Sequence, residues 1–202
     1  MILHRVLCSR ASVLVAVVLC CAWFPQAAPA AVSDVSKVGP VPDELRRQLN
    51  LDPFYQKHIA VGELAILSSS KTSDHALLEA AYIVRHMLSG RPEILHVLAT
   101  NRVRAVIMAH DEYTTDLPEQ RDMRPKVYWD SRARGLGGQI CSGAEENLLC
   151  FPGDPYSAEN IFLHEFAHVI HEEGLKALDP TFNTRLEAAF KSATQRGLWK
   201  GT

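Results

Sequence analysis

Apolar residues recur three and four positions apart in several stretches of this chain, which is the spacing of one helix face. The clearest example runs from Asp74 to Leu88 and ends before the glycine and proline at 90–92. Helices are expected, in chain order, from about Pro42, at 74–88, at 92–99, at about 157–173 and at about 181–196. The helix at 157–173 is expected to begin at the cap residue Ser157 and to end at a left-handed glycine, Gly174.

Runs of β-branched and apolar residues predict a small sheet. Ile59 to Leu67, with Gly62 near its centre, predicts a strand pair, and Val103 to Ala109 predicts a single strand. Residues 111–155 are irregular, apart from a short strand that we place at Asn147 to Phe151. So long an irregular stretch in a compact domain is usually functional. The pattern predicts an α+β domain in which the sheet packs on the helix at 157–173, with additional helices around it.

The first thirty residues have the order of a secretory signal peptide. Arg5 and Arg10 precede an apolar run at 11–24, and Ala28-Pro29-Ala30 supplies small residues for cleavage after about Ala30. The alternative is a membrane anchor, but a spanning helix needs about 20 apolar residues and this run is shorter. We therefore predict a signal peptide at 1–30, a flexible leader at 31–41 and a domain at 42–202. The protein should be secreted, without stable membrane association after cleavage.

Composition supports a folded extracellular domain. The chain has 202 residues, of which 47% are hydrophobic and 22% charged, so wholesale disorder is not expected. Removal of Arg5 and Arg10 with the signal leaves 21 − 2 = 19 basic and 23 acidic residues, a net charge of −4. There is no basic patch of the kind that nucleic-acid-binding proteins carry, so no nucleic-acid partner is expected.

Two cysteines, Cys141 and Cys150, remain after the signal is removed. An even pair in an oxidising compartment predicts a disulfide that closes a short loop and contributes about 2 to 3 kcal/mol. The alternative is a zinc-binding pair, but such cysteines normally lie two to four residues apart.

The candidate chemistry lies in His164-Glu165-Phe166-Ala167-His168. Residues four apart share one helix face, so His164 and His168 can present two imidazoles to one Zn²⁺ ion. In zinc peptidases with this spacing the glutamate does not bind the metal. It takes a proton from a zinc-activated water and delivers it to the leaving amine, which is the role expected of Glu165. The alternative is that both histidines are ordinary core or surface residues.

The third zinc ligand is open at this point. His171 shares the face of His168 but lies about 10 Å along the axis from His164, so it is a rim group or a solvated histidine. His171 and Gly174 stand where metzincins have glycine and histidine, which excludes that arrangement. The internal candidates are Glu187, by its spacing, and Asp179. Glu187 points away from the apolar face of its own helix, so a residue outside the chain is favoured over both.

Five blocks of sequence carry a family resemblance, at 77–84, 128–137, 145–150, 152–156 and the zinc helix through His171. They resemble secreted HExxH zinc metallopeptidases of the gluzincin type and, more distantly, the catalytic domain of anthrax lethal factor. The resemblance implies a zincin-like fold over most of the mature chain. Relatives of this kind continue past 197–202 into a helix that bears an acidic ligand. It therefore also implies a C-terminally incomplete domain, with the third ligand beyond Thr202.

The function expected from these features is hydrolysis of a peptide or protein substrate, held in extended form at the edge of the sheet. The segment from Trp129 to Gly138, with Arg132 and Arg134, either forms a wall of the cleft or is a surface loop with solvated arginines. Two alternatives for the whole protein stay open. One is a non-catalytic zinc-binding module that lacks the third ligand, and the other is a zinc amidohydrolase that acts on non-peptide amides.

Overall fold

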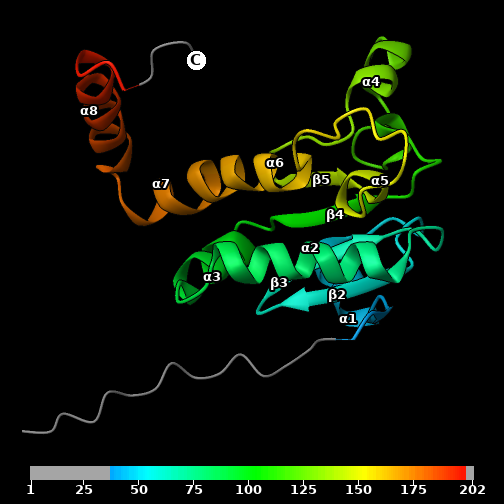
Figure 1. Cartoon of the computed structure of the whole chain (residues 1–202). Helices are drawn as coiled ribbons and strands as arrows, with labels where there is room; N and C mark the ends of the chain where they lie inside the picture. Colours follow the sequence, from blue (N-terminus) through cyan, green and yellow to red (C-terminus); the bar gives the residue numbers. More distant parts are fainter. Residues whose placement is uncertain (1–36, 199–202) are drawn as a thin grey trace, which may run out of the picture. The chain divides into compact units, whose positions relative to one another are not determined.

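The computed structural model describes residues 37–198 (Figure 1). The predicted signal peptide at 1–30 and most of the predicted leader lie outside the described residues, as do residues 199–202. Within residues 37–198, every helix is too short or too polar to cross a membrane.

A five-stranded mixed sheet forms the centre of the fold, in the spatial order β1-β2-β3-β4-β5. The strands are β1 (Gly39–Pro40), β2 (Lys57–Val61), β3 (Leu64–Ser68), β4 (Arg104–Met108) and β5 (Ile140–Ala144). The first three strands pair antiparallel, and β3, β4 and β5 pair parallel. The strand pair predicted around Gly62 and the strand predicted at 103–109 are confirmed. Pairing begins with β1, ahead of the predicted domain start at Pro42.

Helices flank this sheet, so the predicted α+β class is confirmed (Figure 1). They are α1 (Asp43–Leu49), α2 (Asp74–Met87), α3 (Pro92–Thr100), the 3₁₀ turn η1 (Thr114–Asp116), α4 (Lys126–Arg132), α5 (Glu145–Leu148), α6 (Ile161–Val169), the π-helical turn η2 (Ile170–Leu175), α7 (Lys176–Leu178) and α8 (Phe182–Gln195). The helices predicted at 74–88, 92–99 and 181–196 agree with α2, α3 and α8.

The core has two layers, one on each face of the sheet. Because side chains alternate along a strand, Ile66 and Ile107 point towards α2 and α6, while Leu67 and Met108 point to the opposite face. All four are fully buried. On that opposite face they pack with apolar residues of α1 and of the loop that follows it, including Leu51. Burial of these alternating residues determines which face of the sheet each of the helices α1, α2 and α6 packs against.

The prediction of a short strand at Asn147 to Phe151 is wrong. Residues 145–148 form α5, and the strand lies earlier, at Ile140–Ala144. The sequence of β5, Ile-Cys-Ser-Gly-Ala, has little β propensity of its own. Its conformation comes from parallel pairing with β4, which is a tertiary contact that a local pattern does not report.

The predicted bounds of the zinc helix also need correction. The helix α6 begins at Ile161, and its cap is Asn160, whose side chain accepts a hydrogen bond from the backbone N–H of Leu163, instead of Ser157. Gly174 lies inside the π-helical turn and does not end a helix in the left-handed region. A Cβ at Gly174 would lie 2.9 Å from Ile94 Cγ2, so the glycine permits close packing of η2 on α3.

Cys141 and Cys150 are both free thiols in this structure. Cys141 is fully buried within β5, whereas Cys150 is exposed just after α5. Burial, together with the nearby Glu165 carboxylate, raises the pKa of the Cys141 thiol far above its usual range. The disulfide between the two cysteines stays a prediction.

Candidate metal centre

Helix α6 has one packed face and one open face. Phe162, Phe166 and Val169 are fully or almost fully buried against the sheet and α2. The contact with β5 is close, since a Cβ at Gly143 would lie 2.8 Å from Phe162 Cβ. His164 and His168 lie on the open face. Both histidines are therefore accessible to an ion from solvent.

The two imidazoles point at one another. The Nε2 atoms of His164 and His168 lie 3.2 Å apart, and the ring centroids lie 4.9 Å apart. Two nitrogen ligands of one tetrahedral zinc ion lie about 3.3 Å apart, given Zn–N distances of about 2.0–2.1 Å. The pair therefore has the separation that a shared zinc ion requires, and the residues fit the predicted cofactor.

The other nitrogen of His164 is held by a carboxylate. Its Nδ1 lies 2.5 Å from Oε1 of Glu159. Zinc-binding histidines typically donate their second N–H to a carboxylate, which fixes the ring orientation and makes the other nitrogen a better ligand. Sequence reasoning missed Glu159, because five residues on a regular helix do not bring two side chains together. The contact depends on the loop before α6.

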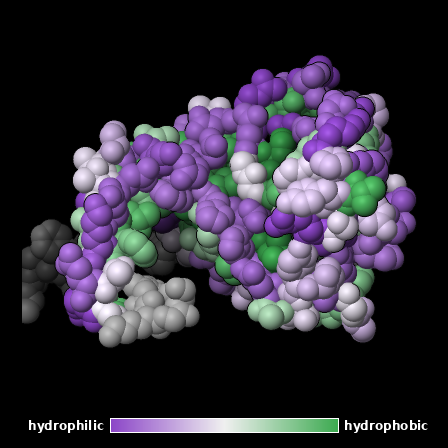
Figure 2. All heavy atoms as spheres, turned by 90° about the horizontal axis from the view of Figure 1, so that it is seen from above, coloured by the Kyte–Doolittle hydropathy of each residue, from purple (hydrophilic) through white to green (hydrophobic). Residues whose placement is uncertain are grey.

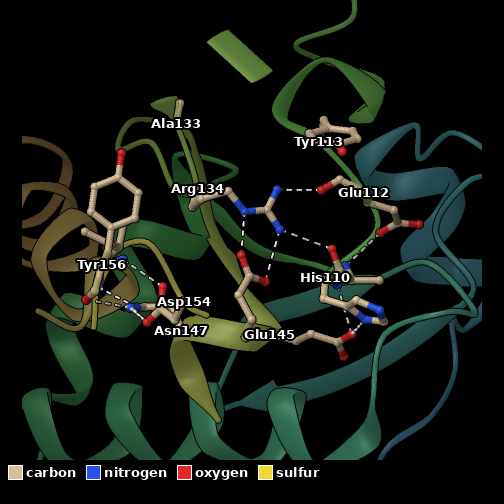
Figure 3. A network of polar contacts seen from close by, with 12 residues as sticks. His110, Glu112, Tyr113, Ala133, Arg134, Glu145, Asn147, Asp154 and Tyr156 are labelled. Carbon is tan, nitrogen blue, oxygen red and sulfur yellow. Dashed lines mark hydrogen bonds and ion pairs between the residues drawn. The ribbon is translucent and has the colours of Figure 1, made fainter. Parts of the chain in front are cut away.

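A buried amide, Asn147 of α5, shapes that loop (Figure 3). Its Nδ2 donates to Asp154 Oδ2 and to the carbonyl oxygen of Glu159, each at 2.8 Å. Its Oδ1 accepts the backbone N–H of Ile161 at 2.8 Å. One side chain thus forms hydrogen bonds with both ends of the segment 154–161. These bonds fix the position of Glu159 before the first turn of α6.

Arg134 anchors the neighbouring segment on the other side of α5 (Figure 3). Its guanidinium is buried, pairs with both carboxylate oxygens of Glu146 at 2.6 and 3.0 Å, and donates to the carbonyl oxygen of Glu112 at 2.5 Å. The prediction of solvated arginines is therefore wrong for Arg134. Its bidentate pairing fixes the start of the glycine-containing segment 135–138.

That segment runs alongside β5 and reaches Glu165. Leu136 forms an antiparallel bridge with Ser142, whose backbone N–H donates to the Leu136 carbonyl at 2.8 Å. A Cβ at Gly137 would lie 3.0 Å from Glu165 Oε2 and 3.7 Å from His168 Cβ. A glycine at this position lets the chain pass directly beside the glutamate and one histidine.

A pocket of about 280 Å³ opens next to Glu165. Its lining includes Tyr128, Trp129, Arg132, Leu136, Tyr156 and Glu165. Arg132 lines this pocket, is exposed to solvent and lies over the Tyr128 ring at 5.1 Å, so the cleft wall at 129–138 stays a prediction. Tyr128 precedes the predicted wall, and Tyr156, whose hydroxyl donates to the Arg132 carbonyl, was not predicted from the sequence. The pocket places an apolar, aromatic surface against the carboxylate expected to act as base.

The remaining predicted site residues lie apart from this pair. His171 Nε2 is 2.7 Å from Asn183 Oδ1, and its ring packs on Phe182, so His171 joins η2 to α8. Glu187 pairs with Lys191 at 2.6 Å, and Asp179 pairs with Arg185. Residues 37–198 contain no cluster of three or more His, Cys, Asp or Glu side chains arranged to hold one metal ion. Within them the structure brings together the two candidate ligands His164 and His168, the candidate base Glu165 and the carboxylate of Glu159.

Two apolar side chains of helix α8 are exposed among residues 37–198. Leu186 is 46% exposed and Phe190 62% exposed. Seen from above, hydrophilic residues cover most of the surface and hydrophobic residues show between them (Figure 2).

This chain matches no family model, and it matches neither a curated protein nor a solved structure.

Exchange of Glu159 for glutamine is expected to weaken zinc binding by about 10- to 100-fold, because the neutral amide is a poorer acceptor for the His164 Nδ1–H. Competition with a chromophoric chelator measures this affinity. The matched control is Glu63→Gln, since Glu63 makes a similar contact to His96, at 3.1 Å on the exposed surface. Equal zinc affinity in the two variants would contradict the role of Glu159.

Proposed function

We propose that this chain is a secreted zinc metallopeptidase with a zincin-like fold of the gluzincin type. The observation that carries the proposal is the 3.2 Å separation of the His164 and His168 Nε2 atoms on the open face of α6, beside Glu165. The Glu159 carboxylate behind His164 is a second observation in its support. The predicted signal peptide supports secretion.

The roles follow from where each group lies. His164 and His168 would hold a zinc ion through Nε2, and Glu159 holds the His164 ring. Zinc at such a site lowers the pKa of a water molecule to about 7. Glu165 stands between this pair and the aromatic pocket, so its carboxylate takes the proton of the attacking water and passes it to the leaving amine. Gly137 lies beside this carboxylate, where a Cβ would stand 3.0 Å from Glu165 Oε2.

The edge of the sheet supports a peptide as the substrate. β5 is the outermost strand of the sheet, and the segment around Leu136 bridges it antiparallel, next to Glu165. An extended substrate laid along this segment adds as a further strand. Its backbone then lies over the histidine pair, His164 and His168. A peptide backbone meets this geometry, whereas a small non-peptide amide makes no use of a strand edge.

The third ligand stays a prediction. We propose that an acidic residue following Thr202 completes the site, because Glu187 and Asp179 are engaged with basic side chains of α8. The second candidate function, a non-catalytic zinc-binding module, is favoured by one observation. Among the described residues no third ligand stands beside the two histidines. The two functions differ in whether a completed site hydrolyses peptides.

The decisive experiment exposes a peptide library to two zinc-loaded proteins, the chain to Thr202 and a version carrying its natural downstream sequence. Mass spectrometry identifies new termini. We expect the extended protein to cleave peptides, a chelator to abolish cleavage and added zinc to restore it, while the shorter chain cleaves weakly. A zinc-loaded extended protein that cleaves nothing would establish the non-catalytic module, and cleavage of non-peptide amides alone would establish the amidohydrolase.

A further inference from the structure

A second pocket, of about 690 Å³, lies away from the metal centre. Its lining includes Leu49 and Leu51, which belong to the core layer on the sheet face opposite α6. The start of β4 and the residue before β5, Gln139, complete one side. None of its lining residues also lines the pocket beside Glu165. A role for this pocket is therefore separate from the metal-centre chemistry.

Three arginines from three segments line this second pocket. Arg102 follows α3, Arg104 begins β4, and Arg121 comes from the irregular stretch after η1. Two carboxylates, Asp52 and Glu119, also line the pocket. Three cations against two anions leave a local excess of one positive charge, in a chain whose formal charge is −2. The pocket is thus locally positive on an acidic protein.

Arg104 is fixed in place, and its Nε atom has no hydrogen-bond partner in the described part of the chain. Only 7% of the residue is exposed, and its Nη2 donates to Glu119 Oε1 at 2.7 Å. The fully buried Tyr55 donates its hydroxyl to the other oxygen of Glu119. The Nε–H of Arg104 is itself buried and has no acceptor among residues 37–198. A buried charged donor without a partner is costly, so this N–H indicates an acceptor that the protein chain does not supply.

The other two arginines differ in how far their charge is neutralised. Arg121 pairs with Asp52 at 2.7 Å. Arg102 donates only to the carbonyl oxygen of Gln48, at 3.2 Å, and has no carboxylate within ion-pair distance in the described part of the chain. Its guanidinium is exposed at the pocket and supplies the uncompensated charge.

We propose that this pocket binds an oxyanion, a phosphate or sulfate group carried as an ester on a larger molecule. The planar guanidinium offers paired N–H donors that match the oxygens of such groups, and charge-assisted bonds of this kind are among the strongest in proteins. Arg104 Nε donates to one oxygen, and Arg102 supplies the charge that the carboxylates leave unbalanced. The volume exceeds what one inorganic ion fills, so the rest of the ligand occupies the space towards Asn50 and Pro53.

An NMR titration of arginine Nε–H resonances in the full chain tests this directly. Inorganic phosphate, sulfate and phenyl phosphate are added at constant ionic strength set with chloride. We expect the Arg104 Nε–H resonance to shift saturably with at least one oxyanion. If the ester is recognised, the dissociation constant from this shift should be lower for phenyl phosphate than for inorganic phosphate. The phosphate and sulfate arms distinguish the two ligand chemistries. No saturable shift with any of the three would overturn the proposal.

Variants give an independent readout. Arg102→Gln removes the uncompensated charge at an exposed position and is expected to weaken oxyanion binding about tenfold. Arg91→Gln makes the same charge change elsewhere, at an exposed arginine paired with Glu93, and should leave the affinity unchanged. Equal weakening by the two variants would reduce the effect to overall charge and overturn the site. Zinc binding and peptide cleavage enter neither measurement, so failure here is distinguishable from failure of the metallopeptidase proposal.

Discussion

Substitution of Glu165 by glutamine should lower peptide hydrolysis by about 10²- to 10⁴-fold and leave the zinc content unchanged. Glutamine keeps the size of the side chain and its contact with the segment at Gly137, but it cannot take a proton from water. Glu165 is not one of the two residues expected to bind the metal, so binding should persist. The measurement pairs kcat/KM on a cleaved peptide with zinc content by atomic absorption, for the protein carrying its downstream sequence.

Two further glutamates sharpen this test. Glu44→Gln changes an exposed carboxylate on α1, paired only with Arg47, and should retain full activity. Glu187→Gln removes one of the two internal candidates for the third ligand. A fall in zinc affinity for Glu187→Gln would place the third ligand inside the chain. An active Glu165→Gln enzyme would rule out Glu165 as the general base.

Loss of either histidine is expected to remove zinc and activity together. His164→Ala and His168→Ala each delete one of the two imidazoles whose Nε2 atoms face one another at 3.2 Å. Both side chains lie on the open face of α6, so their removal leaves the packed face intact and should change the stability of the metal-free protein little. Zinc should raise the melting temperature of the unaltered protein, and this increase should vanish in both variants.

The control is His96→Ala, which alters an exposed histidine of α3 that pairs with Glu63. It should keep both the zinc content and the zinc-dependent increase in melting temperature. If the extended protein held zinc equally well after both His164→Ala and His168→Ala, the motif would be a coincidence and the peptidase proposal would fail.

Local sequence was sufficient to predict those elements whose apolar spacing matches the surface that they bury. Helix α2 and strand β4 were predictable because their apolar spacing, three to four residues in the first and a continuous run in the second, reflects the surface that each presents to the core. The same reasoning placed His164 and His168 on one face of α6, since a spacing of four is a property of any helix. The motif alone therefore predicted which two imidazoles meet.

Local sequence was insufficient where a residue's role depends on a distant partner. β5 owes its conformation to β4, and α5 depends on the contacts of its polar side chains. Glu145, for example, accepts hydrogen bonds from the backbone N–H groups of Ser73 and His110. Burial raises the pKa of the Glu145 carboxyl, but these bonds and the His110 ring outweigh it, and the net shift is downward. No periodicity in the sequence reports such contacts.

The amino-acid sequence by itself determined the α+β class, most of the helices, and a helix that carries two histidines and a glutamate at zinc-site spacing. These depend on interactions between residues a few positions apart. Only the tertiary structure decided that Asn147 holds the loop of Glu159, that Gly137 lies against Glu165, and that three arginines from separate segments share one pocket. Each of these contacts joins residues distant in sequence or held by an irregular loop. Their proximity arises when the sheet assembles and the chain closes around it, which no local pattern encodes.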